Sequence, residues 1–379
     1  MLKEVISIFL IFSVYLADGL NPVITIPGYG GSQGWSIIGH EQHHLWLNVV
    51  DMALSRAYFD QLSLDFDKST NRTIRKGLQG VIFPGWGDTD STDNLGSLFR
   101  YFSKLTKYLE KYNKYYVKSY TLRSAPYDFR KDPVENAFFV TSLMSLVEET
   151  FRIGGKKKVL LISHSMGCIY THYFLSEMSL AWKEKFIAGW IPISGPFGGA
   201  FKSIVGCAIG EAFIPLTDPR PSRVALRTCS STHLLFPNKL GFDENQILVE
   251  IKGVVNITMK NIEKFYQYNN MTEMLKFYNR RTDIANASKA PEGVRVGCVF
   301  SNGYRTNKKL TYPDFKSFVN AENYVLETED ADGTVNWDSL MVCTKWNNTK
   351  TVVLSGYDHL KILDAKGLFE FVKEFLESL

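Results

Sequence analysis

One stretch constrains this chain more than any other: an apolar strand that ends in a turn carrying a serine. Residues 158–170 read Lys-Val-Leu-Leu-Ile-Ser-His-Ser-Met-Gly-Cys-Ile-Tyr. The four consecutive aliphatic residues predict a strand buried on both faces, and helical spacing begins after Gly167. A strand, a small-x-Ser-x-Gly turn and a helix are typical of a nucleophile elbow, with Ser165 at its tip.

The shape of this turn has a chemical reason. A serine hydroxyl is a weak nucleophile unless a tight turn holds it beside a base, and small flanking residues let strand and helix pack closely. The first small position is Ser163 instead of glycine. An ordinary turn serine gives the same short pattern, so the rest of the chain has to decide between the two interpretations.

Length and charge limit the class of protein. The chain has 379 residues, of which 45% are hydrophobic, which is enough for one large α/β domain with insertions or for two domains. The net charge of +4 is small and dispersed. It does not favour a nucleic-acid partner, and it is compatible with an anionic membrane surface.

The first residues predict export. Residues 1–19 are interpreted as a signal peptide, with Lys3, an apolar run over 5–16 and the small residues around Gly19. No later stretch approaches about 18 uninterrupted apolar residues, so no membrane span is expected. Glycosylation sequons support a lysosomal or secreted protein of the secretory pathway. They lie at Asn71, Asn256, Asn270, Asn286 and Asn347.

An early strand and glycine-rich turn are predicted over 21–31, which read Asn-Pro-Val-Ile-Thr-Ile-Pro-Gly-Tyr-Gly-Gly. In a serine hydrolase, a backbone N–H from such a loop joins the N–H after the nucleophile to form the oxyanion hole. Tyr29 and Met166 are the expected donors. A plain turn at the end of a strand is the alternative for this segment.

Residues 32–75 are predicted to form an insertion. An aromatic, apolar stretch within it has no clear period and indicates either a packed helix pair or an element that touches lipid, since tryptophan and amphipathic helices favour the membrane interface. Trp35, Trp46 and Leu47 are the candidate lipid-binding residues.

Strands that alternate with helices predict the fold class. Such a rhythm indicates a mostly parallel sheet covered on both faces, as in the α/β-hydrolase fold, here over residues 20–379. The rhythm is lost over about 200–295, which is predicted to be an inserted cap. Further strands are predicted at 81–83, 115–122, 190–196, 294–300, 324–326 and 351–354, and helices at 98–112, 133–153 and 368–379.

An activated serine needs a base and an acid that orients it. In α/β-hydrolases the chain order is Ser, then Asp or Glu, then His. His359 directly follows a predicted strand and precedes the last helix, which is the expected place for the base, although a surface histidine is the alternative.

Three aspartates are candidates for the acid: Asp330, Asp332 and Asp338. Asp332 is favoured because Gly333 allows a tight turn toward the His359 loop. Asp338 is expected inside the following helix. His164 and His172 are expected to be structural, since neither has a suitable position on the elbow and its helix.

With these residues assembled, longer motifs become visible. The chain resembles the lecithin:cholesterol acyltransferase family over nearly its whole length, and its lysosomal phospholipase A/acyltransferase branch in particular. The similar segments, in the same order, are 22–29, 46–48, 83–87, 125–130, 164–167, 181–183, 195–199, 332–336 and 358–360. The Ala-Pro-Tyr-Asp-aromatic-Arg and Asp-Gly-Thr-Val motifs are far more specific than the elbow alone.

The resemblance implies a catalytic triad of Ser165, Asp332 and His359, with Tyr29 and Met166 as oxyanion donors. It also implies a disulfide between Cys298 and Cys343, and a structural ion pair between Asp128 and Arg130. No metal or organic cofactor is implied, because no His/Cys/Asp cluster has ligand spacing.

The chain departs from the family in two places. The early lid loop is shorter and has no cysteine between Pro27 and Trp46. Of the five cysteines, Cys207 and Cys229 have no obvious counterpart, so whether they pair stays open. An odd count leaves at least one free thiol, and Cys168 is expected to be a small buried hydrophobe.

The predicted function is that of a serine phospholipase A and O-acyltransferase. Its substrate would be a phospholipid at a membrane surface, and its acyl acceptor water or a lipid alcohol. A secreted sterol acyltransferase acting on lipoproteins is the alternative within the family. A catalytically inactive α/β-hydrolase that serves as a binding module is the alternative from another class.

Overall fold

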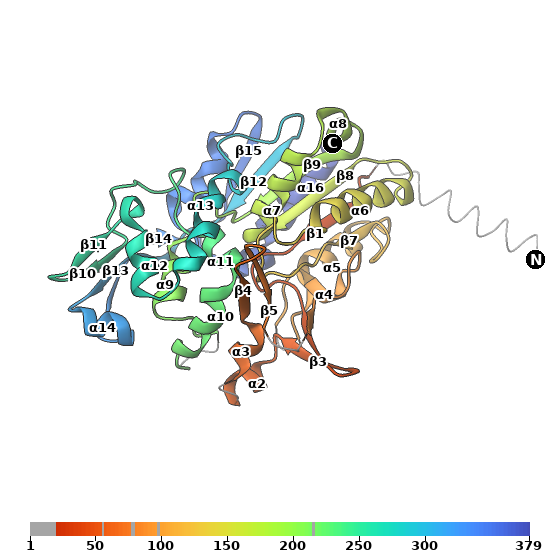
Figure 1. Ribbon diagram of the computed structural model, residues 1–379. Coiled ribbons are helices and arrows are strands. Elements are labelled where there is room, and N and C mark those ends of the chain that lie inside the picture. Colours follow the sequence, from red (N-terminus) through yellow and green to blue (C-terminus); the bar gives the residue numbers. More distant parts are fainter. Residues whose placement is uncertain (1–19, 55–56, 77–79, 97–98, 214–216) are drawn as a thin grey trace, which may run out of the picture.

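The computed structural model describes residues 20–54, 57–76, 80–96, 99–213 and 217–379 (Figure 1). The predicted signal peptide at 1–19 lies outside these residues. Within the described residues, no helix combines the length and the apolar character needed to cross a bilayer.

A parallel sheet forms the centre of the fold. Among the described residues it has six strands, all paired in parallel, and their order is β15-β12-β9-β8-β1-β7. The strands are β1 Val23–Ile26, β7 Leu122–Ser124, β8 Val159–His164, β9 Ile187–Ile193, β12 Val296–Phe300 and β15 Thr349–Val353. This topology, with helices on both faces, confirms the predicted α/β-hydrolase fold.

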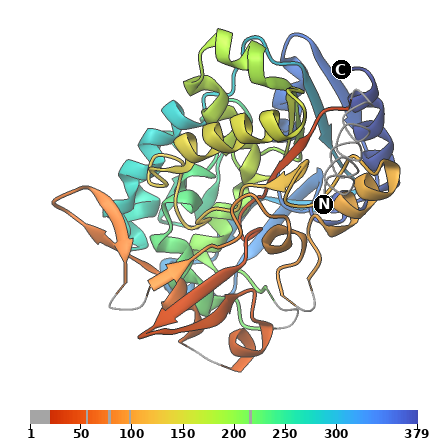
Figure 2. The ribbon, with the colours of Figure 1, turned by 90° about the vertical axis from the view of Figure 1, so that its right-hand side faces the viewer.

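Two apolar cores lie on the two faces of this sheet. Along β8, Leu161 belongs to one core and Leu160 and Ile162 to the other, as the alternation of side chains in a strand requires. Helices α6 (Phe139–Ile153) and α7 (Met166–Glu177) cover the first face, where α8 (Leu180–Phe186) packs against them. Helices α5 (Ser103–Tyr112) and α16 (Lys366–Glu377) cover the second face, as Figure 2 shows in orange and blue.

The insertion near the N-terminus forms a separate layer at the lower edge of the molecule (Figure 1). One small sheet has the order β3-β2-β6, and a hairpin pairs β4 with β5. The strand predicted at 81–83 is therefore β6 of this layer and lies outside the central sheet. The elements are β2 Gly34–Ile38, β3 Glu41–Trp46, α2 Val49–Leu54, α3 Tyr58–Leu62, β4 Leu64–Asp67, β5 Arg72–Arg75 and β6 Gly80–Ile82.

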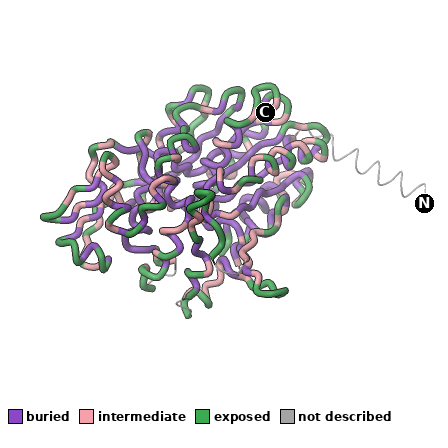
Figure 3. Tube along the Cα trace, in the orientation of Figure 1, coloured by how far each residue is buried: buried purple, intermediate pink, exposed green. Residues whose placement is uncertain are grey.

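The cap has its own sheet and its own core. Strands β11-β10-β13-β14 form the sheet. A third apolar core, separate from the two on the central sheet, is buried in this part of the molecule (Figure 3). The strand predicted at 324–326 is part of β14, which pairs antiparallel with β13 here, so this body reaches past residue 295. Its elements are α9 Phe201–Ala208, α10 Arg223–Thr228, α11 Ser230–Leu234, β10 Val249–Ile251, β11 Val255–Ile257, α12 Glu263–Tyr268, α13 Leu275–Ile284, β13 Tyr304–Tyr312, α14 Phe315–Asn320 and β14 Val325–Ala331, with short 3-10 turns at Arg220–Ser222, Met259–Asn261 and Thr272–Met274.

Short connecting elements complete the chain. They are α4 Asp90–Asp93, α15 Trp337–Leu340, η4 Met341–Lys345 and η5 Lys361–Asp364. The prediction of a strand over 115–122 is wrong except at Leu122, where β7 begins, because turns at 114–115 and 119–121 interrupt the segment. Tyr115 and Tyr116 are buried there, and their hydroxyls donate to the carbonyls of Gly154 and Asn21, at 3.2 Å in both cases.

The helix predicted from residue 133 begins only at Phe139. Asp132 does accept hydrogen bonds from the N–H groups of Val134 and Glu135, both at 3.0 Å, but these close a turn instead of a helix. The other oxygen of the Asp132 carboxylate binds Arg280 of α13. The sequence pattern that predicted a helix start at residue 133 therefore belongs instead to a polar cluster around Asp132 and Arg280.

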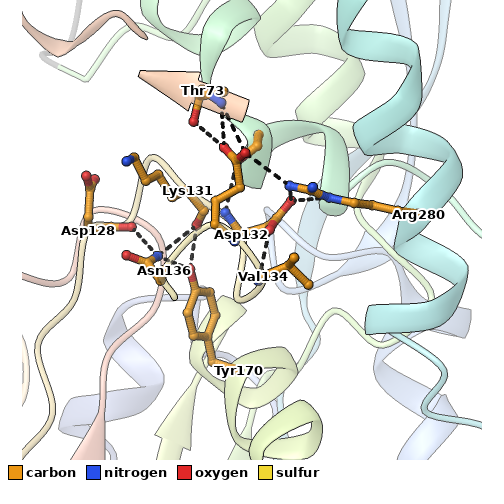
Figure 4. Close-up of polar contacts among 10 residues, drawn as sticks. Thr73, Asp128, Lys131, Asp132, Val134, Asn136, Tyr170 and Arg280 are labelled. Atoms are coloured by element: carbon orange, nitrogen blue, oxygen red, sulfur yellow. Dashed lines mark hydrogen bonds and ion pairs between the residues drawn. The ribbon is translucent and has the colours of Figure 1, made fainter. Parts of the chain in front are cut away.

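This cluster joins the insertion and the cap to the central domain (Figure 4). Glu135 accepts hydrogen bonds from the N–H and hydroxyl of Thr73 on β5. Arg280 binds Asp132 and lies 3.6 Å from Glu135. Tyr170 of α7 donates to the carbonyl of Lys131 at 2.5 Å, so the elbow helix touches the same loop. Burial raises the pKa of Asp132, while Arg280 acts against that rise.

We predict that Arg280→Gln costs about 3 kcal/mol of unfolding free energy, because it leaves two buried carboxylates without their counter-charge. Arg220→Gln is the matched control, since Arg220 makes a similar fork with Asp218 but both side chains are about half exposed. Denaturant unfolding of both variants measures the difference. Equal losses would show that burial of the pair does not matter.

A second prediction concerns pH and the cap. His233 on α11 lies 3.0 Å from both the carbonyl of Arg227 and the hydroxyl of Tyr266. Burial lowers the pKa of His233 to about 4. Because the unfolded histidine has a pKa near 6.5, the stability that His233 contributes is complete above that pH and is lost as the pH falls toward 4.

The protein should therefore lose about 2 kcal/mol of unfolding free energy through His233 alone between pH 7 and pH 5. His233→Gln should show a shallower dependence on pH over this range. His43→Gln, at a half-exposed histidine of the insertion, should retain the wild-type slope. Denaturation midpoints at both pH values test this, and parallel slopes for all three proteins would refute it.

Candidate active site

Ser165 lies on a strained turn at the end of β8. Its backbone has φ 55° and ψ −129°, and α7 begins at the next residue. Residues other than glycine seldom adopt a positive φ, and such backbone strain persists only where the surrounding structure enforces it. This is the geometry that the elbow interpretation requires.

Two glycines allow the elbow to approach β1 closely. A Cβ on Gly167 would lie 2.4 Å from the carbonyl oxygen of Pro27, and a Cβ on Gly28 would lie 2.6 Å from the Cβ of Ser165. Neither contact is tolerable for a larger residue. Ser163, where a glycine was the expected pattern, is buried and its hydroxyl accepts a hydrogen bond from the indole of Trp190 at 2.7 Å.

The structure brings the three predicted triad residues together. Nε2 of His359 lies 2.8 Å from Oγ of Ser165, and its Nδ1 lies 2.7 Å from Oδ2 of Asp332. Asp332 follows β14, and His359 lies between β15 and η5. A carboxylate only accepts, so Nδ1 carries the proton and Nε2 is free to accept from the Ser165 hydroxyl.

Asp332 is held in place from several directions. Its second oxygen accepts from the N–H groups of Thr334 at 2.9 Å and Val335 at 2.7 Å, and its carbonyl accepts from the N–H of His359 at 2.8 Å. Its side chain is fully buried. The other acid candidates are exposed: Asp330 accepts from the N–H of Gly303, and Asp338 lies in α15, as expected.

The two predicted oxyanion donors lie beside the serine. Met166 is the first residue of α7, where the N–H has no partner within the helix. Tyr29 follows Gly28, the residue that contacts Ser165. These positions are compatible with two N–H groups directed to one side of Oγ, and their role belongs to the proposal below.

A narrow, mostly apolar cavity lies against Tyr29, and its volume of about 10 Å³ has room for roughly one water molecule. Its walls come from the insertion, the loop after β7 and the cap. They include Trp46, Phe59, Leu62, Phe129, Phe213 and Leu226. Polar groups are scarce on its walls, but in this structure the cavity is too small for a hydrocarbon chain.

The lipid-binding set predicted from sequence needs correction. Trp46 is only 4% exposed, its Nε1 donates to the carbonyl of Gly30 at 2.7 Å, and its ring packs on Phe129, so it cannot reach a membrane surface. Leu47 and Trp35 are half-buried, the former against the core and the latter against His44. Trp46 instead forms a wall of the cavity.

The structure shows which cysteines are paired and which are free. Cys298 on β12 and Cys343 in η4 form the expected disulfide. Cys168, Cys207 and Cys229, all within the described residues, are free and buried, so the open pairing of Cys207 with Cys229 is not made. Burial raises the pKa of each of these three thiols to about 12, which makes them inert packing groups.

Other expectations can be placed as well. Asp128 and Arg130 form a two-pronged ion pair at 2.8 Å. His172 contacts the carbonyl of Lys289 at 3.0 Å, away from Ser165. All five sequon asparagines are exposed. Across the described residues, no group of three or more His, Cys, Asp or Glu could hold a metal ion.

One side chain beside the triad was not predicted. The hydroxyl of Tyr101 lies 2.5 Å from Nδ1 of His164 and accepts from the N–H of Gly28 at 2.9 Å. In the sequence, Tyr101 falls within the helix predicted over 98–112, and no local pattern distinguishes it from a core residue.

Comparison with known proteins shows which family this chain resembles. The lecithin:cholesterol acyltransferase family model matches residues 40–292. The human "Lysosomal phospholipase A and acyltransferase" is 27% identical over 94% of this chain and 90% of its own. The human "Phosphatidylcholine-sterol acyltransferase" is also 27% identical, over 95% of this chain and 86% of its own.

Among solved structures, a chain of the Tle4–Tli4 complex has a TM-score of 0.54 at 9% identity, covering 94% of this chain and 98% of that one. That likeness shows the fold alone. The relatives by sequence are lipid acyltransferases and phospholipases. Since the family match spans two thirds of the sequence, this chain belongs to the lecithin:cholesterol acyltransferase family.

Proposed function

We propose that this protein is a serine phospholipase A and O-acyltransferase. The observation that carries the proposal is the contact of Ser165 with His359, and of His359 with a buried aspartate. An aligned nucleophile, base and orienting acid are what acyl transfer through a serine requires. A binding module without activity would have no physical need for this alignment.

In the first half of the reaction, Oγ of Ser165 attacks the ester carbonyl of a phospholipid while Nε2 of His359 takes its proton. The N–H groups of Tyr29 and Met166 stabilise the oxyanion, and Asp332 stabilises the imidazolium. His359 then gives the proton to the leaving glycerol oxygen. The lysophospholipid departs and the acyl group remains on Ser165.

In the second half, water or a lipid alcohol attacks the acyl-enzyme. His359 removes the proton from the attacking hydroxyl and returns it to Ser165 as the ester to the protein breaks. To hold the acyl chain during this step, the apolar walls of the cavity beside Tyr29 would have to move apart. Hydrolysis needs no further site, whereas transfer needs an apolar surface that holds the acceptor and excludes water.

A sterol acceptor is the second candidate. The similarity to the sterol acyltransferase is as high as that to the lysosomal enzyme, at 27% identity in both cases. The products formed from mixed vesicles of phospholipid, ceramide and sterol distinguish these two candidate functions. Acyl-ceramide formed at acid pH supports a lysosomal enzyme, and sterol ester formed at neutral pH supports a secreted one.

Ser165→Ala should abolish labelling by a fluorophosphonate probe and lower phospholipid cleavage by at least a thousandfold, since the nucleophile is removed. Ser176→Ala, at an exposed serine on the same helix, should retain both. Mass spectrometry of the labelled peptide and of vesicle products provides the measurement. Wild-type cleavage by Ser165→Ala would exclude the proposed nucleophile.

We further propose that α2 contacts the membrane surface. Its residues Val50 and Leu54 are 60% and 81% exposed, and their spacing of four places them on one face of the helix. Helix α2 lies at the outer end of the insertion (Figure 1). An exposed apolar face in this position is suited to the boundary between headgroups and acyl chains.

Leu54→Asp should therefore lower binding to phospholipid vesicles about tenfold or more, because it removes an apolar contact and adds a charge. Its activity on a water-soluble short-chain ester should stay at the wild-type level. Val325→Asp is the control, since Val325 is 61% exposed on the cap, remote from α2. Vesicle sedimentation and ester hydrolysis separate the two effects, and equal vesicle binding by both variants would argue against α2.

A further inference from the structure

His164, next to the nucleophile, is a buried ionisable group that the mechanism above does not use. It is almost fully buried at the end of β8. Both of its ring nitrogens have partners: Nε2 lies 2.8 Å from the carbonyl oxygen of His359, and Nδ1 lies 2.5 Å from the hydroxyl of Tyr101. These partners come from distant parts of the chain.

The chemistry of these partners fixes the direction of every hydrogen bond. A backbone carbonyl only accepts, so Nε2 of His164 carries the proton and Nδ1 must accept. The hydroxyl of Tyr101 therefore donates to Nδ1, and its oxygen accepts from the N–H of Gly28 at 2.9 Å. Burial lowers the pKa of His164 and raises that of Tyr101, which keeps the imidazole neutral and the phenol protonated.

The result is an unbroken chain from Gly28 through Tyr101 and His164 to His359. One end is the residue before the oxyanion donor Tyr29, and the other end is the backbone of the general base. The rings of His164 and His359 also pack together, with centroids 4.7 Å apart. Tyr101 and His164 thus connect the oxyanion loop to the backbone of the base through hydrogen bonds.

We propose that Tyr101 and His164 are positioning residues that hold the oxyanion loop and the catalytic base in register. This inference rests on the proposed function. Neither side chain touches substrate. Their effect is on alignment, which matters most in the transition state, when the oxyanion and the imidazolium form together.

Tyr101→Phe tests the inference, because it retains the ring and removes only the hydroxyl. We expect kcat on a soluble ester to fall roughly tenfold to a hundredfold, with KM within about twofold. Labelling by a fluorophosphonate should slow in parallel. Hydrogen exchange at the amide of Gly28 should become faster, since that N–H loses its acceptor.

Tyr116→Phe is the matched control. Tyr116 is another buried tyrosine of the same core, and its hydroxyl binds a carbonyl at Asn21, remote from Ser165. Both variants should lose stability to a similar degree, but only Tyr101→Phe should lose kcat. A double variant with His164→Gln should lose little more activity than the worse single variant, because both act through one chain.

The outcomes separate the two proposals. If Ser165 is required for activity but Tyr101→Phe and Tyr116→Phe have the same kcat, the positioning role is refuted and the proposed function stands. If kcat losses of Tyr101→Phe and His164→Gln are additive, the two residues do not act as one chain, which also refutes it. If the wild-type protein has no activity that depends on Ser165, both proposals fall together.

Discussion

The close contact between the elbow and β1 is the constraint on which the site depends. Gly167 lies against the carbonyls of Ile26 and Pro27, and Gly28 lies against Ser165. Ser165 has its positive φ at this contact, and Gly28 is followed directly by Tyr29, the expected oxyanion donor. A side chain at either glycine would therefore disturb both the turn that carries the nucleophile and the loop that carries this donor.

The base and the acid reach this turn from a different part of the fold. Asp332 ends a strand of the cap sheet, while His359 follows the edge strand of the central sheet. Hydrogen bonds through the backbone of His359 connect it both to Asp332 and to His164. The triad thus lies where two sheets meet, and the polar cluster around Asp132 and Arg280 holds the cap to the domain that carries Ser165.

The sequence was sufficient for the parts of the molecule that local chemistry determines. The elbow, the β1 turn and the order of Ser165, Asp332 and His359 follow from short motifs, and the structure assembles them as expected. The sequence was insufficient where the residue that a side chain contacts lies far away along the chain. The sequence near Asp132 does not indicate that its carboxylate will bind Arg280, or that the helix will begin only at residue 139. The aromatic character of Trp46 indicated lipid contact, but burial depends on Phe129 and Phe213, which come from other segments.

Acid pH affects the stability of this assembly through buried ionisable groups that have opposite effects. Burial lowers the pKa of His164, His172 and His233, so each resists protonation in the folded state and favours unfolding as the pH falls below about 6.5. Burial raises the pKa of Asp132, so its contribution to stability is complete below its unfolded pKa and is lost as the pH rises through the folded value. Acid pH would thus cost stability through the three histidines and add stability through Asp132. Because Nδ1 of His164 accepts from Tyr101, a proton on Nδ1 would break the chain between Tyr101 and the base, and the lowered pKa of His164 opposes this protonation.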